Sequence, residues 1–258
     1  MQKGRKKVQT KKLKNKFIFD VDGTLTPSRQ IIDKEFAEWF LTFCQNNDVY
    51  LVTGSDRPKT IEQIGEKLYN TCKRVYNCNG NDVWHKNDNI RTNTWVLPED
   101  AHEWLSIQLA ESEFPLRTGL HFEHRPGMVN FSVVGRNATI GERQLYVKFD
   151  SREKEREGIA KKFNVIFPKI KATVGGETGI DISPIGTDKS QIIQDFGPDD
   201  NTIFFGDRMD PDGNDYPLAK IMHNQENCFV FQAGAPSAED GYKAVSYTHL
   251  TLPTKRIV

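Results

Sequence analysis

A short apolar run that ends in two aspartates and a glycine constrains the fold of this sequence more than any other feature. The segment reads Phe17-Ile18-Phe19-Asp20-Val21-Asp22-Gly23-Thr24. An apolar run without polar alternation is typical of a strand buried on both faces, as in the interior of a parallel sheet. The carboxyl ends of such strands form the edge at which open α/β sheets bind ligands. We therefore expect Asp20 and Asp22 to lie at a ligand-binding edge.

Strand and helix patterns alternate along the first and last parts of the chain. Apolar residues recur at helical spacing over residues 36–43, and a strand-like run over residues 49–52 follows. A helix is expected over residues 58–68, with Pro58 suited to its first turn. A helix from Asp188 and the apolar run 203–205 continue the pattern. Strands that alternate with helices through short connections predict an α/β fold with a doubly wound parallel sheet.

The middle of the chain has a different pattern, in which strands come in pairs between helices. The expected elements are helices over residues 98–110 and 150–163 and strands over residues 116–123, 128–134, 170–174 and 179–183. Hairpins interleaved with helices predict an α+β insertion rather than more parallel sheet. We therefore expect a core of residues 16–84 and 184–244 that is interrupted by an α+β cap of residues 85–183.

Neither end of the chain is expected to belong to the folded core. Eight of the 35 basic side chains lie in the first 16 residues, which contain no acidic residue, so we expect residues 1–15 to form a disordered basic tail. Residues 245–258 open with Val245-Ser246-Tyr247-Thr248-His249-Leu250, which resembles the translation of a sequencing adapter. We therefore expect this last stretch not to belong to the natural chain.

Charge, hydropathy and cysteine content exclude several classes of protein. The chain is neutral overall, so the part that follows the basic tail is acidic, which argues against a nucleic-acid binder. No apolar run is long enough to cross a membrane, and no apolar stretch follows the basic start as in a secretory signal. Four cysteines without a CxxC pair fit a reduced protein. We expect a cytoplasmic protein with no membrane or nucleic-acid partner.

Two acidic loops follow predicted core strands. Asp20 and Asp22 follow the first strand, and Asp207 and Asp215 follow the run 203–205. Carboxylates gathered at one sheet edge would repel one another unless a hard cation neutralised them, and Mg²⁺ suits oxygen ligands. An aspartate beside the metal can attack phosphorus, and a second aspartate can carry the proton. The alternative is that these residues are solvated turn residues, because Asp and Gly favour turns.

Together with Thr53 and Lys189, these residues resemble the four motifs of the haloacid dehalogenase-like phosphotransferases. The resemblance implies that Asp20 becomes the aspartyl-phosphate and that Asp22 acts as general acid and base. It also implies that Thr53 or Ser55 hydrogen-bonds the phosphoryl oxygens, since the alignment of that turn is ambiguous. Lys189 would balance the charge on the nucleophile and the phosphate.

The same resemblance implies the ligands of a Mg²⁺ ion. Asp20, Asp207 and the backbone carbonyl of Asp22 would hold the ion, with Asp215 beside them. A phosphoryl group in transfer spreads negative charge over its oxygens, so positioning and cation stabilisation account for most of the catalysis.

Arginines of the expected cap narrow the resemblance. They lie in Arg125-Pro126-Gly127-Met128-Val129-Asn130, in Gly135-Arg136-Asn137 and in Glu142-Arg143, while Arg29 follows the first acidic loop. Over residues 17–216 the chain resembles the eukaryotic-type α-phosphomannomutase family. The resemblance implies that these four arginines clamp a sugar phosphate. It also implies that Asp181 binds sugar hydroxyls beside Gly179, where the family has a serine. Arginine also suits a remote phosphate because its planar fork matches the phosphate oxygens.

The function implied by the resemblance is that of a Mg²⁺-dependent mutase in mannose metabolism. Such an enzyme interconverts mannose 6-phosphate and mannose 1-phosphate through an aspartyl-phosphate, with a hexose 1,6-bisphosphate as intermediate and activator. The family also implies a homodimer formed through the cap. One alternative is a sugar-phosphate phosphatase on the same scaffold, in which water attacks phospho-Asp20. Another is a non-catalytic protein whose basic tail binds RNA, which the catalytic aspartates disfavour.

Overall fold

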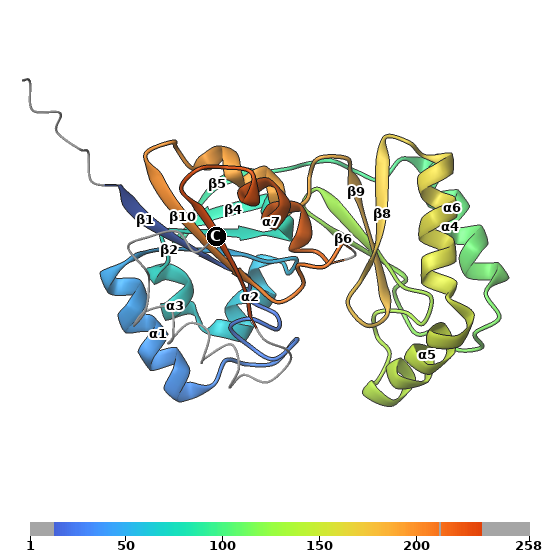
Figure 1. Cartoon of the computed structure of the whole chain (residues 1–258). Helices are drawn as coiled ribbons and strands as arrows, with labels where there is room; N and C mark the ends of the chain where they lie inside the picture. The colour runs from blue at the N-terminus through green and yellow to red at the C-terminus, as the bar shows by residue number, and fades with distance from the viewer. Residues whose placement is uncertain (1–12, 212, 234–258) are drawn as a thin grey trace, which may run out of the picture.

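The computed structural model describes residues 13–211 and 213–233, which form two sheets with their own helices (Figure 1). Within these residues, the larger sheet has the strand order β11-β10-β1-β2-β3-β4-β5. Its strands are β1 (Lys14–Phe19), β2 (Asp48–Val52), β3 (Arg74–Asn77), β4 (Asp82–His85), β5 (Asp88–Thr92), β10 (Asp200–Gly206) and β11 (Cys228–Gln232). The predicted α/β core with a mostly parallel sheet is confirmed.

Strand β1 lies inside the parallel part of this sheet because both of its faces are apolar. It pairs in parallel with β10 on one side and with β2 on the other. Phe17 and Phe19 point to one face and Ile18 to the other, and all three are buried. The carboxyl ends of β1 and β10 therefore lie at the same edge, which brings their two acidic loops together.

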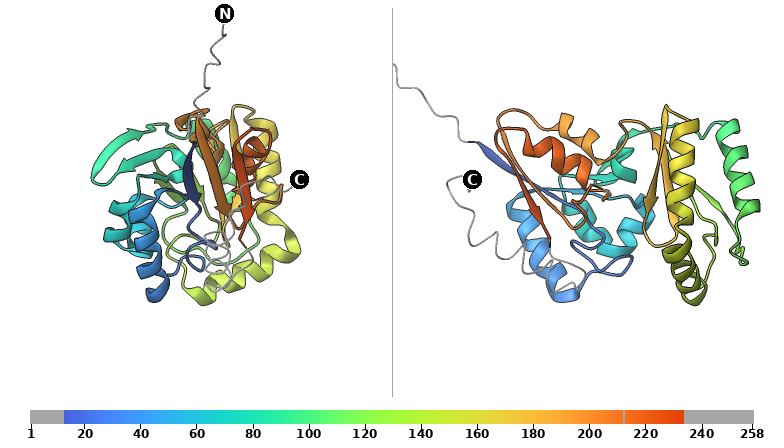
Figure 2. Two further views of the ribbon diagram at one scale, coloured as in Figure 1. Left: turned by 60° about the vertical axis from the view of Figure 1, so that its left-hand side comes forward. Right: turned by 45° about the vertical axis from the view of Figure 1, so that its right-hand side comes forward.

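Helices cover both faces of the core sheet (Figure 2). Helices α1 (Lys34–Asn46), α2 (Arg57–Ile64) and α3 (Glu66–Thr71) pack on the face that carries Phe17 and Phe19. Helix α7 (Tyr216–His223) and the 3₁₀ segment η2 (Lys189–Asp195) pack on the face of Ile18. Asp33 caps α1, as its carboxylate accepts a hydrogen bond from the backbone N–H of Phe36.

The inserted part has its own sheet and its own hydrophobic core. Strands β6 (Phe122–Arg125), β7 (Met128–Phe131), β9 (Gly179–Pro184) and β8 (Ile170–Gly175) form an antiparallel sheet in that order. Helices α4 (Glu99–Glu111), α5 (Ile140–Glu153) and α6 (Glu155–Ile166) lie on the side of this sheet remote from the core (Figure 1). Its other face is turned toward the core.

Several expected elements differ in the structure. The helix expected over residues 58–68 is two helices, because Gly65 between them has a φ of +81°. The helix expected over residues 150–163 starts earlier and is broken at Lys154, where φ is +55°. The helix expected from Asp188 is the 3₁₀ segment η2. The strand expected over residues 116–123 begins only at Phe122.

The strands extend the core beyond its expected limits. Strand β5 pairs antiparallel with β4 and so carries the core sheet past residue 84, where the cap was expected to begin. Strand β1 includes Lys14, within the expected tail. The rest of that tail, residues 1–12, and the stretch 245–258 lie outside the described residues. Among the residues that are described, no helix is long and apolar enough to cross a membrane.

Candidate active site

Asp20 and Asp22 lie in a tight loop at the end of β1. The loop folds around the carbonyl of Val21, which accepts several of its backbone hydrogen bonds. Gly23 has a φ of +85°, and a Cβ atom there would lie 2.2 Å from Oδ2 of Asp207. A glycine is therefore required both by the turn and by the close approach of Asp207 to the loop.

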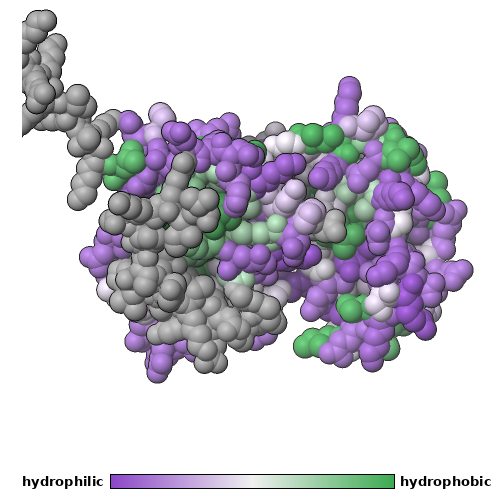
Figure 3. Space-filling view, viewed as in Figure 1, coloured by the Kyte–Doolittle hydropathy of each residue, from purple (hydrophilic) through white to green (hydrophobic). Residues whose placement is uncertain are grey.

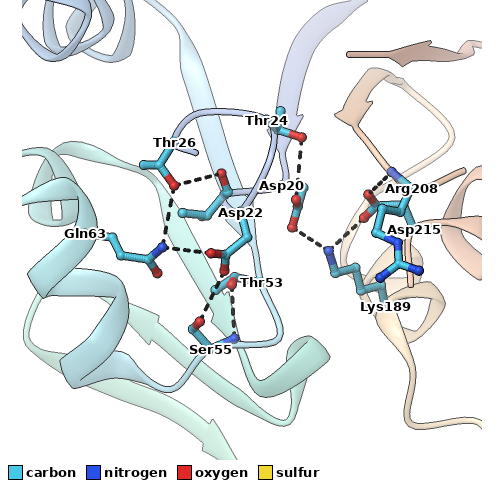
Figure 4. A network of polar contacts seen from close by, with 11 residues as sticks. Asp20, Asp22, Thr24, Thr26, Thr53, Ser55, Gln63, Lys189, Arg208 and Asp215 are labelled. Atoms are coloured by element: carbon cyan, nitrogen blue, oxygen red, sulfur yellow. Dashed lines mark hydrogen bonds and ion pairs between the residues drawn. The ribbon is translucent and has the colours of Figure 1, made fainter. Parts of the chain in front are cut away.

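A buried lysine joins two of the carboxylates (Figure 4). Nζ of Lys189 lies 2.5 Å from Oδ1 of Asp20 and 2.7 Å from Oδ1 of Asp215, and none of the three side chains is more than 2% exposed. Burial opposes the charge of Lys189, but the two carboxylates outweigh it and raise the pKa of the lysine. Burial also raises the pKa of Asp20, against the opposing charge of Lys189. The lysine therefore stays charged.

Asp207 completes a cluster of three carboxylates. One oxygen from each of Asp20, Asp207 and Asp215 lies within 4.8 Å of the others. Burial, and then the charge of Asp215, raises the pKa of Asp207 to about 6. One lysine cannot balance three carboxylates, and oxygen ligands of this kind are those that Mg²⁺ prefers. The donor set therefore fits the predicted ion.

Asp22 is held apart from this cluster by neutral donors. Its Oδ1 accepts from the backbone N–H of Arg29 at 2.6 Å and from Nε2 of Gln63 at 2.9 Å. Its Oδ2 lies 3.4 Å from the hydroxyl of Ser55 (Figure 4). The side chain of Asp22 is thus not part of the carboxylate cluster, and a metal contact through its backbone carbonyl stays a prediction. The two aspartates have different surroundings, which suits two different roles.

Thr53 and Ser55 follow β2 and lie beside Asp22. Thr53 is fully buried, and its Oγ1 accepts from the backbone N–H of Ser55 at 3.0 Å. Because Thr53 acts there as an acceptor, its hydroxyl hydrogen can still be donated to a phosphoryl oxygen. The Ser55 hydroxyl is directed at Asp22 instead. This arrangement favours Thr53 for the phosphoryl contact that the sequence left open between the two.

Arg125 and Arg136 share one glutamate on the core-facing sheet of the cap. Both guanidinium groups pair with the carboxylate of Glu123, that of Arg125 at 2.7 Å. Arg125 also donates from Nη1 to the carbonyl of Gly54 at 3.2 Å, a contact from the cap to the core. Glu123 thus holds two of the four predicted phosphate ligands side by side.

Arg29 and Arg143 extend this group of positive charges. Burial, and then the charges of Arg143 and Arg136, lowers the pKa of Arg29. Arg143 pairs with Glu177 at 3.4 Å, and Glu177 is largely exposed. Three of the four predicted arginines form ion pairs with two carboxylates, those of Glu123 and Glu177, and this gathering of positive charge suits a polyanion.

Two residues on α2 belong to the site although the sequence analysis did not single them out. Gln63 contacts Asp22, and Lys59 lies one helical turn before it. Burial, and then the charges of Arg29 and Arg125, lowers the pKa of Lys59. The four-residue spacing places both side chains on one helix face. That spacing, on the helix that follows Thr53, was the signal that could have identified them.

Asp181 lies on β9 opposite Asn130 of β7. Nδ2 of Asn130 donates to Oδ1 of Asp181 at 2.6 Å. A Cβ atom at Gly179 would lie 2.4 Å from the same Nδ2, so the amide occupies the space of a side chain at that position. The amide of Asn130 thus holds Asp181 and fills the space that the side chain of the family's serine at position 179 would occupy. The sequence offered no signal for this contact because it depends on strand register.

Comparison of the sequence with protein families and with curated proteins points to the same family. The family described as eukaryotic phosphomannomutase matches residues 36–239. The phosphomannomutase of Saccharomyces cerevisiae is 30% identical over 211 residues, which cover 78% of this chain and 83% of that protein. The phosphomannomutase of Schizosaccharomyces pombe is 31% identical over 217 residues, with coverage of 78% and 83%.

Solved structures resemble the fold at low identity. The C-terminal domain of C. albicans trehalose-6-phosphate phosphatase aligns over 92% of each chain with a TM-score of 0.61 and 13% identity. A haloacid dehalogenase-like hydrolase from Bacteroides thetaiotaomicron aligns over 93% of this chain and 100% of that one, with a TM-score of 0.55 and 15% identity. At such identity these structures bear on the fold alone.

Proposed function

The chain belongs to the eukaryotic phosphomannomutase family, and from that membership we propose that it is a Mg²⁺-dependent phosphomannomutase. It interconverts mannose 6-phosphate and mannose 1-phosphate in cytoplasmic mannose metabolism. The observation that carries this proposal is the placement of a buried Asp20–Lys189–Asp215 network on the core and a group of arginines on the facing cap, with Arg29 of the core beside them. When the sugar bears two phosphates, the carboxylate network would face the phosphate that reacts and the arginines would bind the other one.

The carboxylates of Asp20, Asp207 and Asp215 would hold the Mg²⁺ ion. When bound, the ion supplies positive charge that neutralises the carboxylates and stabilises the charge spread over the phosphoryl oxygens. Lys189 keeps its proton and adds a fixed positive charge beside Asp20. Thr53 donates its hydroxyl hydrogen to a phosphoryl oxygen.

Asp20 and Asp22 divide the chemistry between them. A carboxylate oxygen of Asp20 attacks the phosphorus, and the bond between phosphorus and the sugar oxygen breaks as Asp22 donates a proton to that oxygen. In the reverse transfer, Asp22 removes the proton from the free hydroxyl of a bound mannose monophosphate, and that hydroxyl takes the phosphoryl group from phospho-Asp20 to form a hexose 1,6-bisphosphate. The N–H of Arg29 and the amide of Gln63 hold the carboxylate of Asp22 for both steps.

The cap holds the end of the sugar that is not reacting. Arg125, Arg136 and Arg143 of the cap, with Arg29 of the core, bind the remote phosphate, because guanidinium forks match phosphate oxygens and these positive charges lie close together. Asp181 accepts hydrogen bonds from sugar hydroxyls. The hexose 1,6-bisphosphate that forms when phospho-Asp20 gives up its phosphoryl group must turn round before Asp20 removes the other phosphate. Added bisphosphate therefore activates the enzyme, since it phosphorylates Asp20.

A sugar-phosphate phosphatase remains a second candidate because of Gly179. Without a side chain at this position the sugar loses one hydrogen-bonding partner, and a sugar that is held less firmly leaves before it can accept the phosphoryl group. Water would then attack phospho-Asp20. Both candidates form phospho-Asp20, and they differ in whether a sugar hydroxyl or water then takes the phosphoryl group.

One assay separates the two candidates. The protein is incubated with mannose 1-phosphate, Mg²⁺ and a trace of hexose 1,6-bisphosphate, and mannose 6-phosphate and free phosphate are measured separately. We expect mannose 6-phosphate to form faster than free phosphate. Release of phosphate without isomerisation would contradict the mutase and leave the phosphatase.

The proposal includes a homodimer formed through the cap. Exposed apolar side chains occur on all three of its helices, namely Ile107, Ile140, Leu145, Val147, Val165 and Ile166. In the face shown in Figure 3, hydrophobic residues of the cap lie in separate groups among hydrophilic ones. Light scattering coupled to gel filtration is expected to give the mass of two chains. The mass of one chain would contradict the dimer.

A further inference from the structure

A buried ion pair behind the cap sheet is not used by the chemistry described above. Asp150, near the end of α5, binds Arg156 in the first turn of α6. Its Oδ1 accepts from the backbone N–H of Arg156 at 2.8 Å and its Oδ2 from Nε at 2.9 Å. Both side chains are 12% exposed. The pair closes the kink at Lys154 and fixes the direction in which the guanidinium group points.

The free end of that guanidinium group reaches the turn between β8 and β9. Nη1 of Arg156 donates to the carbonyl of Gly176 at 3.1 Å and to that of Gly179 at 3.3 Å. The turn contains glycines at 175, 176 and 179, and glycine has more conformational freedom than any other residue. Two hydrogen bonds from one rigid, planar group therefore hold both sides of this glycine-rich turn.

The same turn borders the residues proposed to bind the sugar phosphate. A Cβ atom at Gly176 would lie 3.2 Å from Nη2 of Arg29, and one at Gly175 would lie 2.2 Å from Oδ2 of Asp181. Glu177, at the tip, pairs with Arg143. A displacement of the turn would therefore move the surroundings of two arginines and of Asp181 together.

We propose that Arg156 is a positioning residue for sugar-phosphate binding, which acts by fixing the two carbonyl groups of the turn at 175–179. This inference rests on the proposed function, because it takes Arg29, Arg143 and Asp181 as the sugar-phosphate site. A role confined to the junction of α5 and α6 would need only the contacts with Asp150. The Nη1 contacts lie beyond that junction and connect it to the site.

The test compares two arginines of the cap that both donate to backbone carbonyls. Arg117 donates to the carbonyls of Leu109 at 2.9 Å and Ser112 at 3.0 Å near the end of α4, where it touches none of the proposed site residues. Arg156→Met, Arg156→Lys and the control Arg117→Met are prepared in the full chain. Affinity for mannose 1-phosphate is measured by titration calorimetry without Mg²⁺, and KM and kcat are measured with Mg²⁺.

We expect Arg156→Met to weaken the affinity for mannose 1-phosphate about tenfold, since small displacements of binding groups have large effects. KM should rise with it, while kcat at saturating substrate changes much less. Arg156→Lys keeps the pairing with Asp150 but cannot span both carbonyls, so it should give an intermediate loss. Arg117→Met should lower the melting temperature and leave the affinity unchanged.

Parent-like affinity in Arg156→Met would overturn the inference, as would an equal loss in Arg117→Met. If Arg156→Met does not fold, parent-like affinity in Arg156→Lys overturns it. The proposed function fails separately, if the parent protein produces no mannose 6-phosphate. A loss of affinity confined to the Arg156 variants would support the positioning role even then. A parent protein that does not bind mannose 1-phosphate would overturn both.

Discussion

Asp20 is shielded from water and lies beside Lys189 and the carboxylates of Asp207 and Asp215. It is 2% exposed, and its ion-pair partner is Lys189. A nucleophile in such a place is costly to ionise unless a further cation arrives, because burial penalises the charged form. The protein without metal should therefore be destabilised by its own carboxylates, and this strain can be measured at Asp207.

The first prediction concerns Asp207→Asn in EDTA. The pKa of Asp207 is raised from 3.8 to about 6 by burial and by Asp215, so the ionised carboxylate opposes folding above about pH 6. That opposition disappears as the pH falls toward 4, because the folded protein then takes up the proton. We predict that Asp207→Asn melts at a higher temperature than the parent near pH 8 and that the difference closes near pH 4.

Near pH 8, Mg²⁺ should make the parent melt at a higher temperature than Asp207→Asn. It should raise the melting temperature of the parent and leave that of Asp207→Asn almost unchanged, because binding to the folded state stabilises it. The exposed Asp88 lies on β5, and Asp88→Asn provides the matched control with no effect in either condition. Equal melting temperatures of parent and Asp207→Asn in EDTA near pH 8 would contradict the account.

A second prediction concerns the sugar-binding side of the site. Gly179→Ser would restore the residue of the family but would place its Cβ against the amide of Asn130, which holds Asp181. We predict weaker binding of mannose 1-phosphate in Gly179→Ser and a much smaller effect of the same change in an Asn130→Ala background. Calorimetric titration of the four proteins gives the coupling between the two positions.

Gly158→Ser is the control, since a Cβ at Gly158 meets nothing within 4 Å. Its affinity should equal that of the parent. Additive effects of Gly179→Ser and Asn130→Ala would show that the two side chains do not compete for one space.

At the scale of single residues, sequence reasoning succeeded where a motif fixes the position along the chain. The aspartates at 20, 207 and 215 meet because β1 and β10 are parallel neighbours, and Lys189 reaches two of them from the start of η2. Gln63 and Asn130 were missed because their partners are set by a helix face and by strand register. Such partners lie far away in sequence and leave no local pattern.

At the scale of elements, hydrophobic periodicity predicted where helices and strands lie better than where they begin and end. The apolar positions of residues 58–68 keep the helical spacing across Gly65, so the break was not visible in that pattern. The break at Lys154 likewise depends on a non-glycine residue in the left-handed region, which Asp150 and Arg156 stabilise. Strands β3 to β5 are short, and tertiary pairing defines them more than composition does.

A third prediction tests the break at Gly65. Its backbone has a φ of +81° and a ψ of 145°, a conformation essentially restricted to glycine, so Gly65→Ala should lower the free energy of unfolding by about 1–3 kcal/mol. The position is exposed and a Cβ there meets nothing, so packing contributes little. Urea unfolding measures the change.

Gly158→Ala is the matched control in the middle of α6. Alanine there should raise the free energy of unfolding by about 0.5–1 kcal/mol, because it favours the helix. A gain in Gly65→Ala similar to that of the control would mean that the two helices are one in solution.

At the scale of the whole molecule, the core brings carboxylates and the cap brings arginines to the same region. Arg125 reaches the carbonyl of Gly54, and Arg29 of the core lies against the turn at Gly176. The two parts thus meet through the groups that the sugar phosphate would contact. Because the proposed mechanism requires the bisphosphate to turn round, we expect these contacts to break and re-form in each turnover.

The most direct measurement is the transfer of radiolabelled phosphate from a hexose 1,6-bisphosphate to the protein in the presence of Mg²⁺. The account predicts one labelled residue, Asp20, with a bond that hydroxylamine cleaves as it does an acyl phosphate, and no label in Asp20→Asn. A labelled Asp20→Asn protein, or one that converts mannose phosphates at the parental rate, would contradict it.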